Sequence, residues 1–206
     1  LITCYLSTIL HTGITALNLP WFHLLQSIRS HPLDTFFIII SFMGKPVVIL
    51  AASLLISIIL FLKKQHRTAY HFIELIIMAS ASVILLKHLF YYPRPSGFNY
   101  FDTSSSLPSG HTCLSLCFYG YLALLTNQVN NKTPSWLSYS IAVTLITLIS
   151  ISRLYLGMHW LTDILSSLLL GTVLLLATSI STFRLPTPNA NLQLKLFTWV
   201  STIFAS

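Results

Sequence analysis

His159 and Asp163, near the end of the chain, form a pair that could attack phosphorus. They are four residues apart at the start of an apolar run, so on a helix they share one face. The carboxylate would then accept a hydrogen bond from one ring nitrogen and leave the other as a basic lone pair, the form in which imidazole is a nucleophile. The alternative is an ordinary helix start, in which Asp163 caps nearby backbone N–H groups.

A guanidinium precedes this pair. Arg153 lies six residues before His159, and Gly157 lets the backbone turn between them. Its planar fork suits two parallel hydrogen bonds to phosphate oxygens. Ser152 could bond a phosphate oxygen or the local backbone, and Arg153 could instead extend toward lipid headgroups.

Two further cations lie seven residues apart, Lys87 within an apolar stretch and Arg94 between two prolines. A helix that persists to Tyr92 would project both toward one pocket. Burying Lys87 costs on the order of 3 kcal/mol unless an anion neutralises it. We expect that anion to be a phosphate, although Asp102 is an alternative counterion.

The segment Pro108-Ser109-Gly110-His111 is the third polar cluster. Its small residues allow backbone N–H groups to approach an oxyanion, and the apolar run that follows predicts a helix whose N-terminus favours negative charge. His111, if protonated, could donate its proton to a departing oxygen. A Ser-Gly pair at a helix start is also an ordinary cap.

A zinc site is the main alternative to a phosphate site, because His111, His159 and Asp163 are all possible ligands. Three neighbouring cations would repel a metal ion, so we expect neither a metal nor another cofactor. The cysteines show no ligand-like spacing, and we interpret Cys113 and Cys117 as small packing residues.

The composition predicts an all-α integral membrane protein. The 206 residues are 54% hydrophobic and only 7% charged, against about a quarter charged in a soluble domain. The net charge of +7 comes from residues at the ends of apolar runs and not from a basic stripe, which argues against nucleic acid as a partner. Six transmembrane spans are expected, at residues 2–19, 36–62, 69–90, 110–127, 135–152 and 160–182.

Two of these expectations concern the first third of the chain. The second span is overlong and holds Gly44-Lys45-Pro46, where we expect a kink or a break from an interfacial helix. Residues 20–34 mix aromatic and polar groups and predict a short helix at the headgroup level.

The distribution of Lys and Arg predicts the orientation. Lys63, Lys64 and Arg67 lie in one short connection and Lys132 lies in another on the same side, which should be cytoplasmic. The polar clusters then open to the outer face, which is the periplasm in a Gram-negative bacterium. We expect a location in a bacterial inner membrane. Residues 1–206 are expected to form a single domain, which could be a piece of a longer polypeptide.

Lys87-x6-Arg94-Pro95, Pro108-Ser109-Gly110-His111 and Ser152-Arg153-x5-His159-x3-Asp163 together resemble the three-part signature of the type-2 phosphatidic acid phosphatase superfamily, in the same order and spacing. The motifs run from Lys87 to Asp163, and no position departs from the signature. Soluble vanadium haloperoxidases share these residues, but the predicted spans exclude that branch.

The resemblance implies a metal-independent membrane lipid phosphatase. In it His159 attacks phosphorus, Asp163 orients the imidazole and His111 protonates the leaving group. The residues implied to hold the phosphate are Lys87, Arg94, Ser109, Gly110 and Arg153, and Ser152 is a further candidate for binding it. Substrates implied are phosphatidate, phosphatidylglycerophosphate, undecaprenyl pyrophosphate or lipid A, with no obligate protein partner. A lipid phosphotransferase and a non-catalytic lipid-phosphate transporter or scaffold remain as alternatives.

Overall fold

A computed structural model describes residues 13–95, 104–129 and 134–183, which form helices and no strand. A short 3-10 helix, η1, covers Gly13–Leu17. The α-helices are α2 (Asn18–Ser27), α3 (His31–Met43), α4 (Pro46–Leu62), α5 (His66–Leu89), α6 (Gly110–Val129), α7 (Ser135–Tyr155) and α8 (Leu161–Phe183). The expectation of an all-helical protein is therefore confirmed for the described residues.

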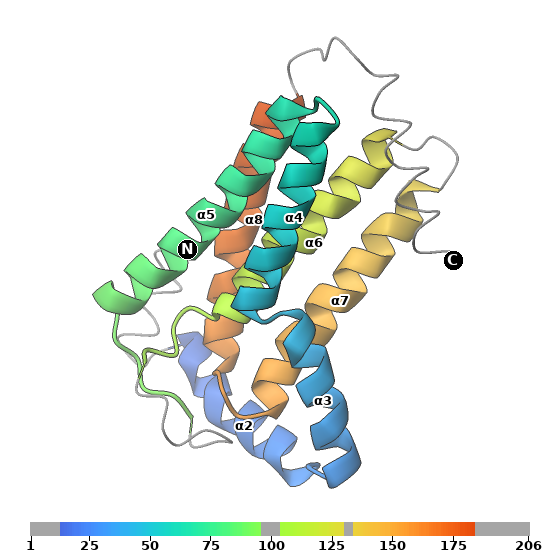
Figure 1. Ribbon diagram of the computed structural model, residues 1–206. Coiled ribbons are helices and arrows are strands. Elements are labelled where there is room, and N and C mark those ends of the chain that lie inside the picture. The colour runs from blue at the N-terminus through green and yellow to red at the C-terminus, as the bar shows by residue number, and fades with distance from the viewer. Residues whose placement is uncertain (1–12, 96–103, 130–133, 184–206) are drawn as a thin grey trace.

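Helices α4 to α8 run alongside one another as a bundle, and α2 and α3 lie at its lower end (Figure 1). Helix α6 is the central one, since it contacts α4, α5, α7 and α8. Its side chains are correspondingly buried: Cys113, Cys117 and Tyr121 are all inaccessible to solvent. Both cysteines are free and pack in the core, as predicted. The ring of Tyr121 stacks on Phe72 of α5 with centroids 5.2 Å apart.

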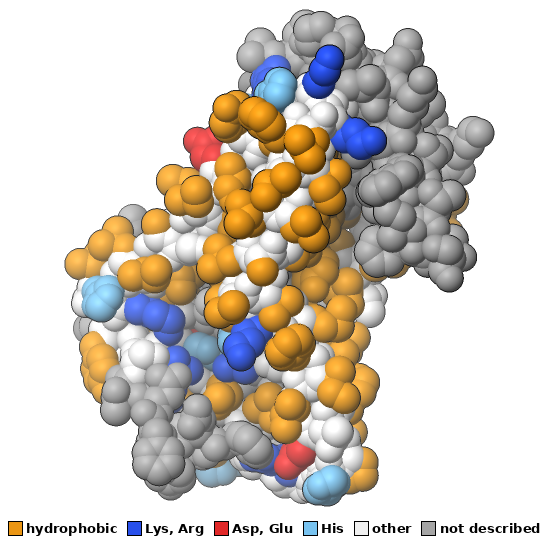
Figure 2. All heavy atoms as spheres, viewed as in Figure 1, with side chains coloured by type: hydrophobic (Ala, Val, Ile, Leu, Met, Phe, Trp, Pro, Cys, Tyr) orange, Lys and Arg blue, Asp and Glu red, His pale blue; other side chains and the backbone are white. Residues whose placement is uncertain are grey.

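Large apolar side chains cover the outer faces of the helices (Figure 2). Leu62, Val47 and Ile84 are all more than half exposed. Such a surface is unusual for a soluble protein, whereas it suits contact with lipid acyl chains.

Within the described residues, four helical segments are long and apolar enough to cross a bilayer: His31–Leu62, His66–Leu89, Ser135–Tyr155 and Leu161–Thr182. The expected count of six spans is thus only partly supported. The fourth expected span, residues 110–127, coincides with α6, which is not among the four. Its enclosure by other helices explains this, because a central helix can carry polar residues without exposing them to lipid. The first expected span, 2–19, lies mostly outside the described residues, and its last two residues begin α2.

The expected interruption at Gly44-Lys45-Pro46 is present, and it separates α3 from α4. Lys45 is extended, with φ −61° and ψ 127°, and Pro46 occupies the first position of α4, where a missing N–H costs nothing. A Cβ at Gly44 would collide with the side chain of Ile149 on α7. The elbow therefore packs closely against the neighbouring helix, which fixes the position of Lys45.

Helices are present where a short interfacial helix was expected, as α2 and the start of α3, and their place at the headgroup level stays a prediction. Arg29, between the two helices, donates to both carboxylate oxygens of Asp34, at 3.1 and 2.9 Å. Gln26 donates to the Tyr155 carbonyl at 3.0 Å, which ties this region to the end of α7. The N-terminal helices are thereby held against the end of the bundle that carries the polar clusters.

Candidate active site

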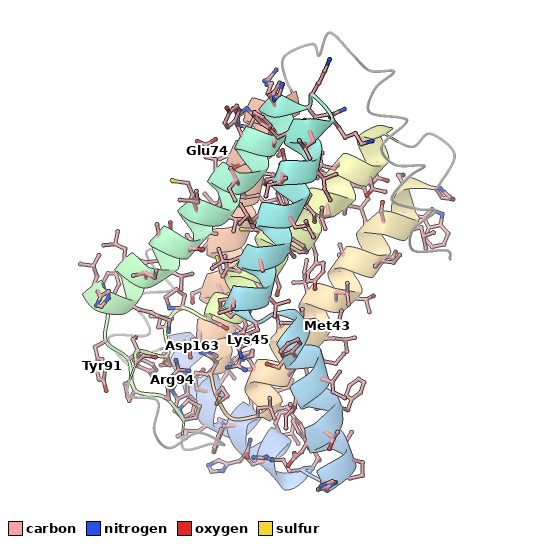
Figure 3. All side chains as sticks on the ribbon, viewed as in Figure 1. Met43, Lys45, Glu74, Tyr91, Arg94 and Asp163 are labelled. Atoms are coloured by element: carbon pink, nitrogen blue, oxygen red, sulfur yellow. The ribbon has the colours of Figure 1, made fainter. Side chains whose placement is uncertain are left out.

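The polar clusters meet at one end of the bundle, where α5 and α7 end and α6 and α8 begin. Figure 3 shows Arg94, Asp163 and Lys45 at this end, with Glu74 toward the other. In Figure 2 several Lys and Arg side chains surround a His in a hollow at the same level. Residues separated by more than seventy positions in the sequence are therefore neighbours in space.

His159 and Asp163 form a buried pair. The His159 Nδ1 is 3.3 Å from Asp163 Oδ2, and the two side chains are 3% and 0% exposed. The same carboxylate oxygen accepts the backbone N–H of Trp160 at 2.8 Å, so Asp163 also caps the start of α8. Both expectations for Asp163, orienting the imidazole and capping a helix, are compatible in one geometry.

The environment of His159 favours the neutral imidazole. Burial, followed by the positive charges of Arg153, Arg94 and Lys87, holds the pKa of His159 well below its usual range. The guanidinium Nη1 of Arg94 lies 3.5 Å from His159 Nε2, the nitrogen that does not face Asp163. An anion that approaches this nitrogen would therefore also contact the guanidinium of Arg94.

Arg94 is held by backbone carbonyls. Its Nη1 donates to the Met158 carbonyl at 2.9 Å, and its Nε donates to the Ser104 carbonyl at 3.1 Å. The indole N–H of Trp160 donates to the carbonyl of Pro93 at 2.8 Å. Two hydrogen bonds thus join the segment that carries Arg94 to the one that carries His159.

Lys87 donates to the carbonyl of Ser105. The Ser105 hydroxyl accepts the backbone N–H of Tyr92 at 3.1 Å and donates to the Phe90 carbonyl at 2.8 Å. Asp102, the alternative counterion, lies outside the described residues. The Ser105 carbonyl is a neutral partner, and by itself it supplies less electrostatic compensation than an anion would.

Arg153 is buried near the end of α7, and its Nη1 donates to the hydroxyl of Ser41 on α3 at 2.7 Å. Its burial places it inside the protein, and the lipid-headgroup alternative does not describe it. The neighbouring Ser152 donates its hydroxyl proton to the Ile149 carbonyl at 2.6 Å. A role for Ser152 in binding phosphate would require breaking that bond.

Ser109 lies just before α6 and is fully buried. Its backbone N–H donates to Ser167 Oγ at 2.7 Å, and Ser167 donates in turn to the Asp163 carbonyl at 2.6 Å. The Ser109 N–H is therefore already used, which leaves the next backbone N–H groups, those of Gly110 and His111, as the candidates for an oxyanion. His111 is the second residue of α6, and the charges of Arg153 and Arg94 act on its imidazole.

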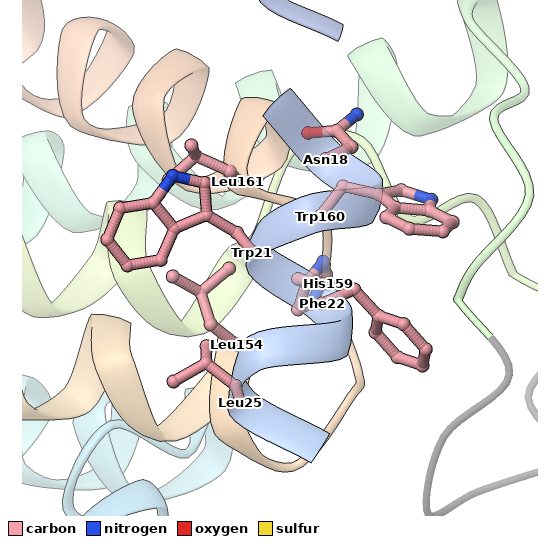
Figure 4. A pocket seen from close by; sticks show the side chains of 8 residues that line it. All are labelled: Asn18, Trp21, Phe22, Leu25, Leu154, His159, Trp160 and Leu161. Carbon is pink, nitrogen blue, oxygen red and sulfur yellow. The ribbon is translucent and has the colours of Figure 1, made fainter. Parts of the chain in front are cut away.

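A small, mostly apolar depression adjoins His159 (Figure 4). Helix α2 lies on one side of it, and the end of α7 and the start of α8 lie on the other. The residues lining it are Asn18, Trp21, Phe22, Leu25, Leu154, His159, Trp160 and Leu161. Asn18 and Thr162 exchange two hydrogen bonds of 3.1 Å, which clamp α2 to the first turn of α8 beside Asp163.

A family model, described as the PAP2 superfamily, matches residues 46–186, more than half of the chain. The chain belongs to the PAP2 superfamily. The match includes every residue of the three motifs and begins immediately after Lys45.

Two curated relatives are similar over parts of this PAP2 protein. Lipid phosphate phosphatase delta of Arabidopsis thaliana is 36% identical over 72 residues, 34% of this chain and 17% of the plant protein. Phosphatidylglycerophosphatase B of Bacillus subtilis (strain 168) is 36% identical over 75 residues, 35% of this chain and 37% of that protein. The alignments thus span well under half of either relative.

Two solved structures share the PAP2 fold. The transmembrane PAP2-type phosphatidylglycerolphosphate phosphatase from Bacillus subtilis superposes with a TM-score of 0.75 at 21% identity, covering 91% of this chain and 98% of that one. Aquifex aeolicus LpxE gives a TM-score of 0.59 at 24% identity, covering 79% and 94%. This PAP2 chain is accordingly an integral membrane protein, with several candidate spans.

Sequence reasoning missed the side chains that hold the PAP2 motif residues in place. Ser41, Asn18 and Ser167 are short polar residues in apolar helices, and no spacing rule connects them to Arg153 or Asp163. Lys45 was noticed only as part of a kink. A polar residue on an otherwise apolar helix was the available signal, because such a group requires a buried partner.

The metal alternative involves the same PAP2 residues. Within the described ranges, no three His, Cys, Asp or Glu side chains lie together in a way that could hold a metal ion. Independence from metal stays a prediction, and the assay proposed below includes a chelator to test it.

Proposed function

We propose that this protein hydrolyses the phosphate ester or pyrophosphate of a membrane lipid through a phosphohistidine intermediate on His159. The observation that carries the proposal is the buried His159–Asp163 pair, 3.3 Å apart, with the opposite ring nitrogen facing Arg94. This arrangement combines an oriented, neutral nucleophile with a cation where the phosphate oxygens would lie. Membership of a superfamily that includes lipid phosphate phosphatases supports it.

The first step forms a bond between His159 Nε2 and phosphorus and breaks the bond between phosphorus and the leaving oxygen. Arg94, Arg153 and Lys87 would stabilise the charge that spreads over the remaining phosphate oxygens. His111 would donate a proton to the departing oxygen, which leaves as an alcohol or as a lipid monophosphate. A phosphate dianion among these cations would supply the negative charge that favours the protonated form of His111.

The second step returns the enzyme to its starting state. Water attacks phosphorus and the bond to Nε2 breaks, while His111 now accepts a proton from the water. Asp163 would stabilise the positive charge on the imidazole through Nδ1 in both steps. Inorganic phosphate then leaves the cations.

The apolar side chains beside His159 support a lipid as substrate. Trp21, Phe22 and Leu25 line the same small depression as His159. A phosphate bound at His159 would place an attached hydrocarbon close to these side chains. Phosphatidate, phosphatidylglycerophosphate and a prenyl pyrophosphate all fit this description. The name of the Bacillus relative, phosphatidylglycerophosphatase B, makes phosphatidylglycerophosphate a natural first substrate to test.

We also propose that the site opens to the outer side of the membrane. Lys63 and Lys64 are exposed at the opposite end of the bundle, where the positive-inside rule assigns the cytoplasm. In a bacterial inner membrane the substrate phosphate would then enter from the periplasm.

The test is phosphate release by the purified full chain in detergent micelles. Phosphatidate, phosphatidylglycerophosphate, undecaprenyl pyrophosphate and lipid A would be assayed in parallel, each with a chelator present. We expect turnover of at least one lipid, a phosphate label on His159 in a rapid acid-free quench, and no dependence on the chelator. Absence of release from every lipid, or full activity in His159→Ala, would contradict the proposal.

A further inference from the structure

Lys45 is a fourth cation near the candidate site, in addition to Lys87, Arg94 and Arg153. Lys45 is exposed and lies at the elbow between α3 and α4, in the region where Figure 3 also shows Arg94 and Asp163. It is close enough to His111 to act on that imidazole electrostatically, as Lys87 does. None of the three motifs includes it, and the family match begins at the next residue.

The backbone around Lys45 is fixed on both sides. Gly44 packs against Ile149, and the carbonyl of Met43 accepts the hydroxyl of Tyr119 on α6 at 3.0 Å. Pro46 lies near Gly110, the residue that precedes His111. The elbow therefore keeps the Lys45 side chain next to the start of α6 without needing a bond to its ammonium group.

Each acidic side chain in the described part of the chain pairs with a group other than Lys45. Asp34 pairs with Arg29, Glu74 pairs with His71 at the other end of the bundle, and Asp163 holds His159. The contact found for the Lys45 ammonium is the ring of Phe42, 5.9 Å from its centroid. An aromatic face leaves the ammonium able to bind an anion.

The charge around the site exceeds what one phosphate needs. Lys87, Arg94, Arg153 and Lys45 provide four positive charges against the single carboxylate of Asp163, which leaves three. A phosphomonoester carries about two negative charges at neutral pH. A lipid with a second phosphoryl group brings about one more, which would balance the site.

We propose that Lys45 binds a second phosphoryl group of the substrate, beyond the one that His159 attacks. The preferred lipids are then those with two phosphoryl groups, either joined as a pyrophosphate or separated by a glycerol as in phosphatidylglycerophosphate. This inference rests on the proposed function and narrows its substrate class. Lys87, Arg94 and Arg153 hold the phosphate that is transferred, and Lys45 recognises the one that stays on the lipid.

The first experiment compares Lys45→Met with the wild type on phosphatidate, phosphatidylglycerophosphate and undecaprenyl pyrophosphate. We expect kcat/KM to fall about tenfold for a two-phosphate lipid and to stay within about twofold for phosphatidate, as for loss of one hydrogen bond to a charged group. Lys45→Arg should retain most of the activity. Lys63→Met removes an exposed lysine from the opposite end and should leave all three rates unchanged.

The pattern over the two lipids identifies the second phosphoryl group. Loss on the pyrophosphate alone assigns Lys45 to the directly bonded phosphate, and loss on phosphatidylglycerophosphate alone assigns it to the phosphodiester. Equal loss on all three lipids, or no loss on any, overturns the inference while leaving the proposed function intact.

A binding measurement keeps the inference testable if no lipid is hydrolysed. Calorimetry on the wild-type protein in detergent would compare inorganic pyrophosphate and glycerol 1,3-bisphosphate with orthophosphate. We expect at least one of the two-phosphate anions to bind about tenfold more tightly than orthophosphate, and Lys45→Met to remove that advantage. Equal affinity for all three anions, or an advantage that survives in Lys45→Met, overturns it.

Discussion

The two ends of the helix bundle use the same residue types in different ways. At the end formed by the α4–α5 connection, Lys63, Lys64 and His66 are exposed. At the other end Lys87 and Arg94 are half-buried, Arg153 is buried, and all three donate to oxygen atoms of the protein. Composition does not distinguish the ends, because both are rich in basic residues.

The difference shows how a cation is held in place when it lies inside a membrane protein. An exposed lysine is solvated, and its charge sets the orientation of the chain at little energetic cost. A buried or half-buried arginine must be positioned by other groups. Ser41 does this for Arg153, and the carbonyls of Ser104 and Met158 do it for Arg94. Substitutions at the two ends should therefore have unequal effects on activity.

The largest effect is expected at the nucleophile. His159→Ala removes the atom proposed to form the bond to phosphorus, and the rate should fall about a millionfold, to the assay background. His88→Ala is the matched control, because His88 is an exposed imidazole in the last turn of α5, at the same end of the bundle as His159. The measurement is phosphate release in micelles, and comparable loss in both variants would argue against a specific role for His159.

Arg153→Ala should lower kcat about a hundredfold to a thousandfold, as for removal of an oxyanion-stabilising donor. Arg67→Ala is the control at the other end, where Arg67 donates to the Ser181 carbonyl, and it should stay within about twofold of the wild type. Steady-state kinetics on one lipid, with melting temperatures of both variants, would separate catalysis from folding. If the two arginines proved equally sensitive, the contrast between the ends would fail.

A smaller effect is expected for the group that positions Arg153. Ser41→Ala removes the acceptor 2.7 Å from Nη1, and kcat/KM should fall about tenfold while the protein stays folded. Ser41→Thr keeps the hydroxyl and should restore activity.

Ser53→Ala is the control for this variant, because Ser53 is a fully buried serine on α4 whose hydroxyl has no hydrogen-bond partner within the described part of the chain. Removing that hydroxyl should not lower activity. Identical kinetics for Ser41→Ala and the wild type would show that Arg153 needs no support from α3.

The smallest expected change is a shift in titration. Burial, followed by Arg153, Arg94 and Lys87, lowers the pKa of His159, so its reactive neutral form should persist below the ordinary His value of about 6.5. In Arg94→Gln one nearby positive charge is lost, and the pKa should rise toward that value. Nitrogen-15 NMR of labelled histidines, assigned by difference with His159→Ala, would measure both midpoints. A wild-type midpoint at or above 6.5 would contradict this electrostatic description.

The fold was predictable from the sequence where hydropathy and helix-breaking residues agree. The break at Gly44-Lys45-Pro46 and the limits of α7 were expected to within a few residues, because proline and runs of apolar side chains act locally. The status of α6 was not predictable in this way. Its enclosure by four other helices depends on tertiary packing, which the residues of α6 alone do not encode.

The candidate site shows the same division. The residues proposed to carry the chemistry, such as His159 and Arg153, are recognisable from type and spacing. Their supports are not, because the bond between Ser41 and Arg153 joins residues 112 positions apart. Catalytic roles, orientation and the extent of the domain stay predictions.

The bonds from Arg94 to the Met158 carbonyl and from Trp160 to the Pro93 carbonyl have a mechanical consequence. Helices tilt when a bilayer thins or thickens, and α5 and α8 need not tilt together. Two hydrogen bonds join the segment that follows α5 to the segment that precedes α8, so a displacement of one segment moves the other with it. The spacing between guanidinium and imidazole should then tolerate changes in lipid composition better than the helix angles do.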